Sequence, residues 1–459
     1  MKHIKHYNKE MILLILALAW PTMLEQAMQT AVQYIDTAMV GSLGTQATAA
    51  VGATSTVNWL IGSTIMALGI GFLAYIAKAF GSGNKEAAKD ASAQAALMVL
   101  LVGSMTTVLI CSVSSKVPVW MQVDPAIQST AALYFFILYL PMLPRTASMI
   151  FGTILRAAGD TKTPMKIGVL VNLINVLLNF LMIYPTRTLT LLGIRILMPG
   201  LGWGVLGAAV ASAVSFVVGG LLITIAVYRH PLVSFKGRSF KPDMDILKPC
   251  FKVAFPNMLQ RFGTSMGYVV FASMINSIGE IATAAHTIAN TVESAFYIPG
   301  YGMQTAAATL AGNAYGAKDA KKMKELSAMF IPIEVFLMTC SGALLFIMAP
   351  SLMSIFSTNE EVIRLGSTVL RMVAVSEPFY GYSIIVEGFM QGVGKTKLPF
   401  IFNIIGMWGI RIVGTFICIT FFHTGLISAW ACMIAHNLLL FGLFVWCHLT
   451  GRWNPLHHH

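Results

Sequence analysis

Charge is the scarcest feature of this 459-residue sequence, since only 10% of the residues are Asp, Glu, Lys or Arg. A soluble domain carries roughly 25% charged residues, so this chain has too few to cover a globular surface in water. Hydrophobic residues make up 56% of the sequence, and its mean hydropathy is +0.74. The shortage of charge excludes a soluble globular protein and indicates a membrane protein.

Cysteines and catalytic motifs are scarce as well. The six cysteines lie within or at the edge of apolar segments without metal-ligand spacing, so we expect neither a disulfide framework nor a metal site. Gly392-Val-Gly-Lys-Thr lacks the spacing of a phosphate-binding loop, and no nucleophile–base or zinc motif occurs. We expect no enzyme and no cofactor, so any active transport must draw its energy from an ion gradient.

Apolar segments of roughly 20 residues, long enough to cross a bilayer, fill most of the chain. The first is too long and too polar for a cleaved signal peptide, so we interpret it as a permanent helix. The expected fold class is an all-α integral membrane protein with twelve transmembrane helices: 11–40, 48–80, 88–114, 126–156, 163–186, 202–228, 246–276, 281–314, 324–349, 361–392, 398–422 and 425–449.

The net charge of +12 does not indicate a nucleic-acid partner, because the basic residues gather in alternate connections between the predicted helices. The connections of the opposite side contain only Lys116, Arg187 and Arg195. By the positive-inside rule, the side rich in lysine and arginine faces the cytoplasm. We therefore predict a multi-pass protein of the cell membrane, in contact with the lipid bilayer and with both termini cytoplasmic.

The sequence repeats itself at an offset of 235 residues, as Pro21 recurs at Pro256 and Gly81 recurs at Gly316. Six helices return the chain to its starting side, so the two copies are parallel repeats. Transporters built this way place the substrate near the interface of their two halves. Other matched pairs are Gly44 with Gly279, Ala47 with Ala282, Gly159 with Gly394, and Pro164 with Pro399.

The repeat predicts the domain organisation. Residues 1–228 form an N-terminal six-helix lobe, the polar stretch 229–245 is a cytoplasmic linker, and residues 246–456 form a C-terminal six-helix lobe. We interpret the histidines at 457–459 as the remnant of a purification tag. The connection 185–201 is about fourteen residues longer than its counterpart, since the offset falls from 235 to 221 there.

The first predicted helix carries a polar stripe. Glu25, Gln29 and Asp36 fall on one helical face, with Gln33 beside them, and the stripe is about 16 Å long. An ionisable group inside the membrane costs roughly 2.5–3.5 kcal/mol and is a functional candidate by default. The stripe is either a wall of a cavity that binds protons or cations, or a buried hydrogen-bonded network between helices.

The repeat separates these two interpretations. Asp36 aligns with Phe271, so its carboxylate occurs in one lobe only and symmetric packing does not require it. Glu25 aligns with Gln260, so that position is polar in both lobes and has a structural explanation. The comparison favours Asp36 as the functional carboxylate.

A second polar face lies in the fifth predicted helix, where Asn172, Asn175 and Asn179 recur at i, i+3 and i+7. Amides can coordinate a cation or hydrogen-bond a carboxyl in either protonation state. The alternative is polar adhesion between helices. Tyr134 of the fourth helix is a further candidate for the same cavity.

In the second half, Gln260 and Arg261 are expected to face the first helix across the cavity. The other intramembrane ionisable residues have an alternative explanation, because two arginines and three glutamates can neutralise one another. These residues are Arg261, Arg411, Glu293, Glu377 and Glu387, while Glu334 has no visible partner in the sequence.

Several motifs together resemble the multidrug and toxic compound extrusion (MATE) family over essentially the whole chain. The most specific are Gln33-Tyr-Ile-Asp-Thr-Ala-Met-Val-Gly, Leu155-Arg-Ala-Ala-Gly-Asp-Thr-Lys-Thr-Pro, and the stretch from Val292-Glu-Ser to Gly312. Ala284-Ala-His-Thr-Ile-Ala-Asn and Pro256-Asn-Met-Leu-Gln-Arg are more similar to the DinF-like bacterial branch. The resemblance implies two six-helix bundles around a V-shaped cleft and export of organic cations in exchange for protons or sodium.

The resemblance also implies residue roles. Asp36 matches the aspartate that binds the coupling ion, Asn175 matches a polar neighbour, and Pro21 matches a proline at which the helix bends. Asn179 departs from the family pattern, because several sodium-binding members have aspartate there. With one carboxylate fewer, protons are favoured over sodium, and a sodium site at Asp36 and Asn175 is the weaker alternative.

The expected function is therefore secondary antiport of cationic, amphipathic drugs or toxic organic compounds by a monomer. The alternative within transport is a flippase for lipid-linked precursors, which would need a more cationic cavity than the first lobe offers, where Arg145 is the main intramembrane basic group. A major-facilitator carrier is disfavoured, since the Gly/Asp/Arg-rich loop between its second and third helices is missing.

Overall fold

The computed structural model describes residues 2–457, so 458 and 459 of the expected tag lie outside the described residues. The first bundle contains α1 (Lys2–Gly41), α2 (Thr45–Gly81), α3 (Lys85–Val113), α4 (Val117–Trp120), α5 (Gln128–Tyr139), α6 (Met142–Ala157), α7 (Lys162–Met182) and α8 (Val205–Arg229), with strands β1 (Pro185–Leu191) and β2 (Ile194–Leu201). The second contains α9 (Met244–Asn276), α10 (Glu280–Phe296), α11 (Ile298–Gly316), α12 (Ala320–Phe356), α13 (Glu360–Gly392), α14 (Lys397–Ile404), the π-helix η1 (Ile405–Ile412), α15 (Val413–Thr420) and α16 (Leu426–Leu449).

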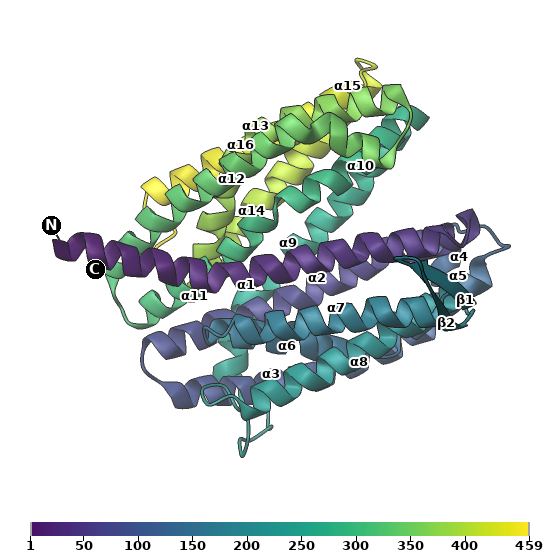
Figure 1. Cartoon of the computed structure of the whole chain (residues 1–459). Helices are drawn as coiled ribbons and strands as arrows, with labels where there is room; N and C mark the ends of the chain where they lie inside the picture. The colour runs from purple at the N-terminus through teal and green to yellow at the C-terminus, as the bar shows by residue number, and fades with distance from the viewer. Residues whose placement is uncertain (1, 458–459) are drawn as a thin grey trace.

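The two bundles form a V (Figure 1). They approach each other near α11, at the end that holds both chain termini, and diverge toward the end that holds α10, α15 and the β1–β2 hairpin. We call these the termini end and the hairpin end. Toward the hairpin end, the Tyr34 hydroxyl of α1 still reaches across and donates to the Thr291 carbonyl of α10 at 2.8 Å. The expected membrane fold of two six-helix repeats around a V-shaped cleft is confirmed.

The predicted spans differ from the observed helices where proline interrupts the backbone. Span 126–156 is broken at Leu140–Pro141 into α5 and α6, which meet at 50°. Span 281–314 is divided at Tyr297, two residues before Pro299 in the first turn of α11. Proline lacks an amide donor and disfavours helical backbone before it. By contrast, α1 continues through Pro21.

Nine helices within residues 2–457 are long and apolar enough to cross a membrane, or ten when α5 and α6 count as one bent span. The two remaining predicted spans correspond to α9 and to the α10–α11 pair. Helix α9 is less hydrophobic because it has charged residues near its start, including Lys248 and Lys252. Helix α10 is only 17 residues long, which is short for a helix that crosses a membrane alone.

The long connection 185–201 is a β-hairpin, which the all-α expectation missed. Its strands pair antiparallel, and Leu192 and Gly193 form the two-residue turn with φ of 51° and 83°. Positive φ at both turn residues matches the right-handed twist of the flanking strands. Alternating threonine and leucine before the Leu-Gly pair was the sequence signal for this hairpin.

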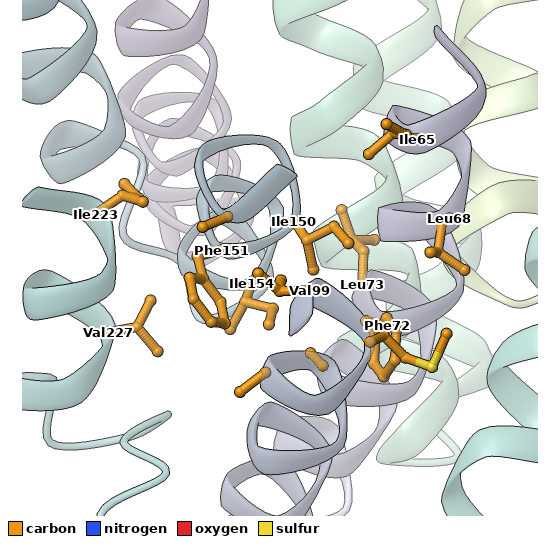
Figure 2. Packing of buried hydrophobic residues seen from close by; sticks show 14 of the residues in the cluster. Ile65, Leu68, Phe72, Leu73, Val99, Ile150, Phe151, Ile154, Ile223 and Val227 are labelled. Carbon is orange, nitrogen blue, oxygen red and sulfur yellow. The ribbon is translucent and has the colours of Figure 1, made fainter. Parts of the chain in front are cut away.

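The core of the first bundle is formed by interlocking apolar side chains (Figure 2). Phe72 of α2, Val99 of α3 and Phe151 of α6 are almost fully buried, and Ile223 and Val227 of α8 close the cluster. This packing holds α2 against α6 and α3 and so fixes the surface that α2 presents to the second bundle.

The bundles meet where α2 crosses α11 without intervening side chains. A Cβ atom on Gly81 would lie 1.9 Å from the Asn313 carbonyl oxygen, and one on Gly316 would lie 2.0 Å from the Lys78 carbonyl oxygen. Lys78 and Asn313 are 235 positions apart, as are Gly81 and Gly316. The contact is therefore reciprocal, and the pseudo-two-fold axis passes through it. We call these four residues the seam.

The helices beside the seam follow the same symmetry. Helix α1 packs on α11, where a Cβ on Gly302 would lie 3.0 Å from the Ala19 carbonyl oxygen. Helix α9 packs on α2, where a Cβ on Gly71 would lie 2.3 Å from the Cys250 carbonyl oxygen. The first helix of each repeat thus packs on the second helix of the other.

In each bundle, an equivalent loop residue contacts the segment that follows the last helix, α8 or α16. In the first bundle, Asp160 accepts hydrogen bonds from Thr163 and lies 3.6 Å from His230 Nε2, just after α8. In the second, Lys395 lies 235 positions later and donates to the Arg452 carbonyl after α16 at 2.8 Å. Burial alone would raise the pKa of Asp160, but the nearby His230 and the hydrogen bonds from Thr163 outweigh it and lower this pKa to about 2.

Replacing Gly81 by alanine is expected to destabilise the protein by about 1–3 kcal/mol, because the new methyl group overlaps backbone that cannot rotate away. Gly316→Ala should cost a similar amount by symmetry. Thermal unfolding in detergent measures the effect, with Gly442→Ala as the matched control, since no atom lies within 4 Å of a Cβ there. A Gly81→Ala protein that melts like the wild type would contradict the close crossing.

Replacing Asp160 by asparagine is expected to cost about 1–2 kcal/mol at pH 7. The pKa of Asp160 in the folded protein is below its ordinary value of 3.8, so its stabilisation is complete above that value and is lost as the pH falls toward 2. Melting temperatures of both proteins in detergent, measured at descending pH, should therefore converge. A difference that stays constant down to pH 2 would refute this role.

Candidate functional site

Asp36 of α1 lies against two asparagines of α7. The Asn179 amide nitrogen donates to Asp36 Oδ1 at 2.5 Å. With its nitrogen directed at Asp36, Asn175 lies 3.1 Å from both carboxylate oxygens, and its own oxygen accepts from Ser212 of α8 at 3.3 Å. Three helices of the first bundle thus build the Asp36 site.

The asparagines are more deeply buried than the carboxylate. Asn179 is 1% exposed and Asn175 is 7% exposed, whereas Asp36 is partly exposed. The Asn179 amide oxygen is buried and has no hydrogen-bond partner. A buried acceptor without a donor is rare, and here it lies on the residue that contacts Asp36. It can accept a hydrogen bond from the O–H group of a carboxylic acid or contribute an oxygen ligand to a cation.

Other predicted members of this site lie around it. Tyr134 of α5 is buried within electrostatic reach of Asp36. Asn172 is partly exposed on α7, and Gln29 and Gln33 are exposed on α1. None of these last three has a hydrogen bond to Asp36. The structure therefore brings Asn175 and Asn179 onto Asp36, and the roles of the other four remain predictions.

Glu25 is paired rather than free. Its carboxylate accepts from Arg156 of α6 at 2.6 Å, and Gly168 of α7 makes room for it, since a Cβ there would lie 3.1 Å from Glu25 Cγ. The ion pair joins α1 to the end of α6, and Thr309 of α11 donates to the Arg156 carbonyl at 3.3 Å. This geometry gives Glu25 a structural role in addition to the predicted place in the cavity.

The ionisable residues of the second bundle form no direct ion pairs with one another in the described part of the chain. No ion pair among residues 2–457 contains Glu293, Glu377, Glu387, Arg261 or Arg411. The Arg411 guanidinium lies over the rings of Tyr268 and Phe271, at 4.8 and 4.3 Å. Glu334 and Glu377 are fully buried, and their carboxyl oxygens have no hydrogen-bond partner.

Gln260 of α9 has a partner, Glu387, with which the sequence analysis did not pair it. It is 5% exposed and donates to Glu387 of α13 at 2.8 Å. Arg261, the next residue, is partly exposed. Across the described residues, no three His, Cys, Asp or Glu side chains are grouped so that they could hold a metal ion. The Asp36 site offers one carboxylate and two amides to an ion.

The family model named MatE matches residues 21–181 and again 256–417. The two matches start 235 residues apart and together cover well over half of the chain. The chain belongs to the MatE family. Members are transporters, so the prediction that the protein is no enzyme is confirmed, and the MatE protein handles small organic substrates in a membrane.

Relatives of known name agree with this assignment. A probable multidrug resistance protein NorM of Thermotoga maritima is 26% identical over 439 residues, which cover 96% of this chain and 92% of the relative. A probable multidrug resistance protein YoeA of Bacillus subtilis is 24% identical, with coverage of 93% and 92%. The DinF-like branch stays a prediction.

The fold is that of solved MATE transporters. A structure described as the outward-facing conformation of a multidrug resistance MATE family transporter superimposes with a TM-score of 0.88 at 24% identity. The similarity covers 97% of this chain and 96% of that one.

Asn179→Asp is expected to convert the Asp36 site into a sodium site, because two adjacent carboxylates repel each other unless a cation or proton lies between them. Sodium should then raise the melting temperature of this variant in detergent at neutral pH, while the wild type responds weakly. Asn172→Asp is the matched control on the same helix. Equal responses of wild type and Asn179→Asp to sodium would contradict the prediction.

Proposed function

We propose that this MatE protein is a secondary antiporter that exports cationic, amphipathic compounds in exchange for protons. The observation that carries the proposal is the Asp36 site, where two amides hold one intramembrane carboxylate that forms no ion pair in the described part of the chain. Because the second repeat has Phe271 at the equivalent position, packing symmetry does not account for this carboxylate.

Protonation of Asp36 requires a place for the new O–H group. The unpartnered Asn179 oxygen provides an acceptor on a residue that already contacts the carboxyl. Once protonated, Asp36 no longer offers a counter-charge to a cation in the cleft, so the exported compound leaves. A proton and an organic cation then compete for one charge, which is the thermodynamic requirement for coupling.

Pro21 is the proposed bending point of α1. It has no amide hydrogen, so the Ala17 carbonyl one turn earlier lacks its helical donor. Asp36 lies about four turns away along the same helix. A change in the bonds that α7 makes to Asp36 can therefore alter the path of α1 at little cost to its hydrogen bonds.

The lobes 1–228 and 246–456 are the proposed moving bodies, connected by the linker 229–245, and the monomer is the proposed unit. The abundance of lysine and arginine in the connections at the termini end supports a cytoplasmic location for that end. The bundles then diverge toward the outside (Figure 1). Sodium is the weaker candidate as the coupling ion, because the site contains a single carboxylate.

Ethidium efflux from energised cells tests this function. Asp36→Asn is expected to reduce efflux to the level of cells without the protein, because the amide cannot exchange a proton. Glu280→Gln, at an exposed carboxylate at the start of α10, is the matched control and should export normally. Collapse of the proton gradient should stop wild-type export, and collapse of the sodium gradient should not.

Full export by Asp36→Asn would refute the role of this carboxylate. Export that follows the sodium gradient would refute proton coupling. Complete absence of ethidium export by the wild type would instead favour the lipid-linked flippase.

A further inference from the structure

The second bundle holds a carboxylate among three amides. Glu387 of α13 accepts from Gln260 of α9 at 2.8 Å, from Gln391 one turn later at 3.2 Å, and from Asn403 of α14 at 3.3 Å. All three partners donate from neutral amide groups, and Glu387 forms no ion pair in the described part of the chain. We call these four residues the Glu387 cluster.

The Glu387 cluster occupies the positions of the second repeat that are equivalent to the surroundings of the Glu25–Arg156 ion pair in the first repeat. Gln260 is equivalent to Glu25, and Gln391 is equivalent to Arg156. The first bundle thus has an acid and a base at the two positions where the second bundle has two amides.

The remaining two members complete the correspondence. Glu387 is equivalent to Gly152, where a Cβ would lie 3.3 Å from an Arg156 guanidinium nitrogen, and Asn403 is equivalent to Gly168, which makes room for Glu25. The first bundle therefore neutralises the Glu25 carboxylate with its own Arg156. The second bundle supplies a carboxylate from a different position and leaves it without a cation.

An uncompensated carboxylate inside a membrane protein does not face lipid. Helix α13 packs against α10, α11, α12, α16 and α2, so it is surrounded by protein. Glu387 is nevertheless partly exposed, which places it at a surface between helices. Arg261, beside Gln260, forms no ion pair with it in the described part of the chain.

Aromatic side chains lie in the same region as Glu387. The hydroxyls of Tyr301 of α11 and Tyr380 of α13 are within electrostatic reach of both Glu387 and Arg261. Tyr301 is 38% exposed although its helix lies between the bundles, and Tyr380 packs on Tyr297 with ring centroids 4.9 Å apart. Aromatic faces next to a carboxylate suit an organic cation, which gains from both.

We propose that Glu387 is the counter-charge that binds the positive group of the exported compound in the second bundle. This inference rests on the proposed function and adds a substrate site to it. The ligand class is a compound with a permanent or protonated ammonium-like charge on an apolar body. Glu387 is then a second counter-charge for the cation, while Asp36 stays the charge for which the cation and the proton compete.

Binding of radiolabelled tetraphenylphosphonium to the purified full-length protein in detergent tests the assignment. Glu387→Gln is expected to weaken binding by about tenfold or more, because a charged contact is lost. Gln391→Arg should weaken binding similarly, because it places an arginine one turn from Glu387. This arginine would neutralise Glu387 as the equivalent Arg156 neutralises Glu25 in the first bundle. Glu280→Gln is the matched control and should bind like the wild type.

An uncharged tetraphenyl analogue measures the apolar part of the binding and should bind all four proteins equally. Melting temperatures establish that the variants are folded, and Gln391→Arg retains the Glu387 carboxylate should Glu387→Gln fail to fold. Wild-type affinity in both Glu387→Gln and Gln391→Arg would overturn this inference and leave the antiporter intact. A wild type that neither binds the phosphonium nor exports ethidium would overturn the proposed function and this site together.

Discussion

The close crossing of α2 and α11 is the constraint on which the rest of the structure depends. Two carbonyl oxygens occupy the space that side chains would need at Gly81 and Gly316, so the two repeats can meet only in one register. That register places the pseudo-two-fold axis at the termini end. The helices beside it, α1 and α9, are then oriented alike in the two bundles, and both carry polar residues into the space between them.

The two repeats share one backbone fold but carry different charged residues at equivalent positions, and these differences point to function. Equivalent positions have equivalent packing, so a polar residue present in only one repeat is not explained by the fold. Asp36 opposite Phe271 and Glu387 opposite Gly152 are such cases, and each carboxylate is held by amides from neighbouring helices. Glu25 is the contrasting case, because Arg156 compensates its charge within the same bundle.

Much of the fold could be predicted from the sequence, because long apolar segments determine helices in a bilayer and a constant offset determines the repeat. Helical spacing also predicted that Asn175 and Asn179 share a face, and both contact Asp36. The predicted spans missed the helix breaks at Pro141 and Tyr297 and the hairpin after α7. These features depend on local backbone signals, whereas the spans were assigned from the length of apolar segments. Two of the three partners of Glu387 come from other helices, α9 and α14, so spacing along α13 could identify only Gln391. Comparison of polar positions across the repeat could have identified the other two.

The β1–β2 hairpin gives the two bundles unequal contact with their surroundings. Leu192 at its tip is fully exposed, and Ile194 and Leu197 are 66% and 69% exposed, while Arg187 stacks on Tyr184 with 4.1 Å between guanidinium and ring centre. Apolar residues beside an arginine–tyrosine pair are typical of the zone of lipid headgroups. We therefore expect the hairpin to contact the interfacial layer beside the first bundle, whereas the described residues of the second repeat contain no strand. A bilayer that holds the hairpin in this layer would resist tilting of the first bundle more than tilting of the second.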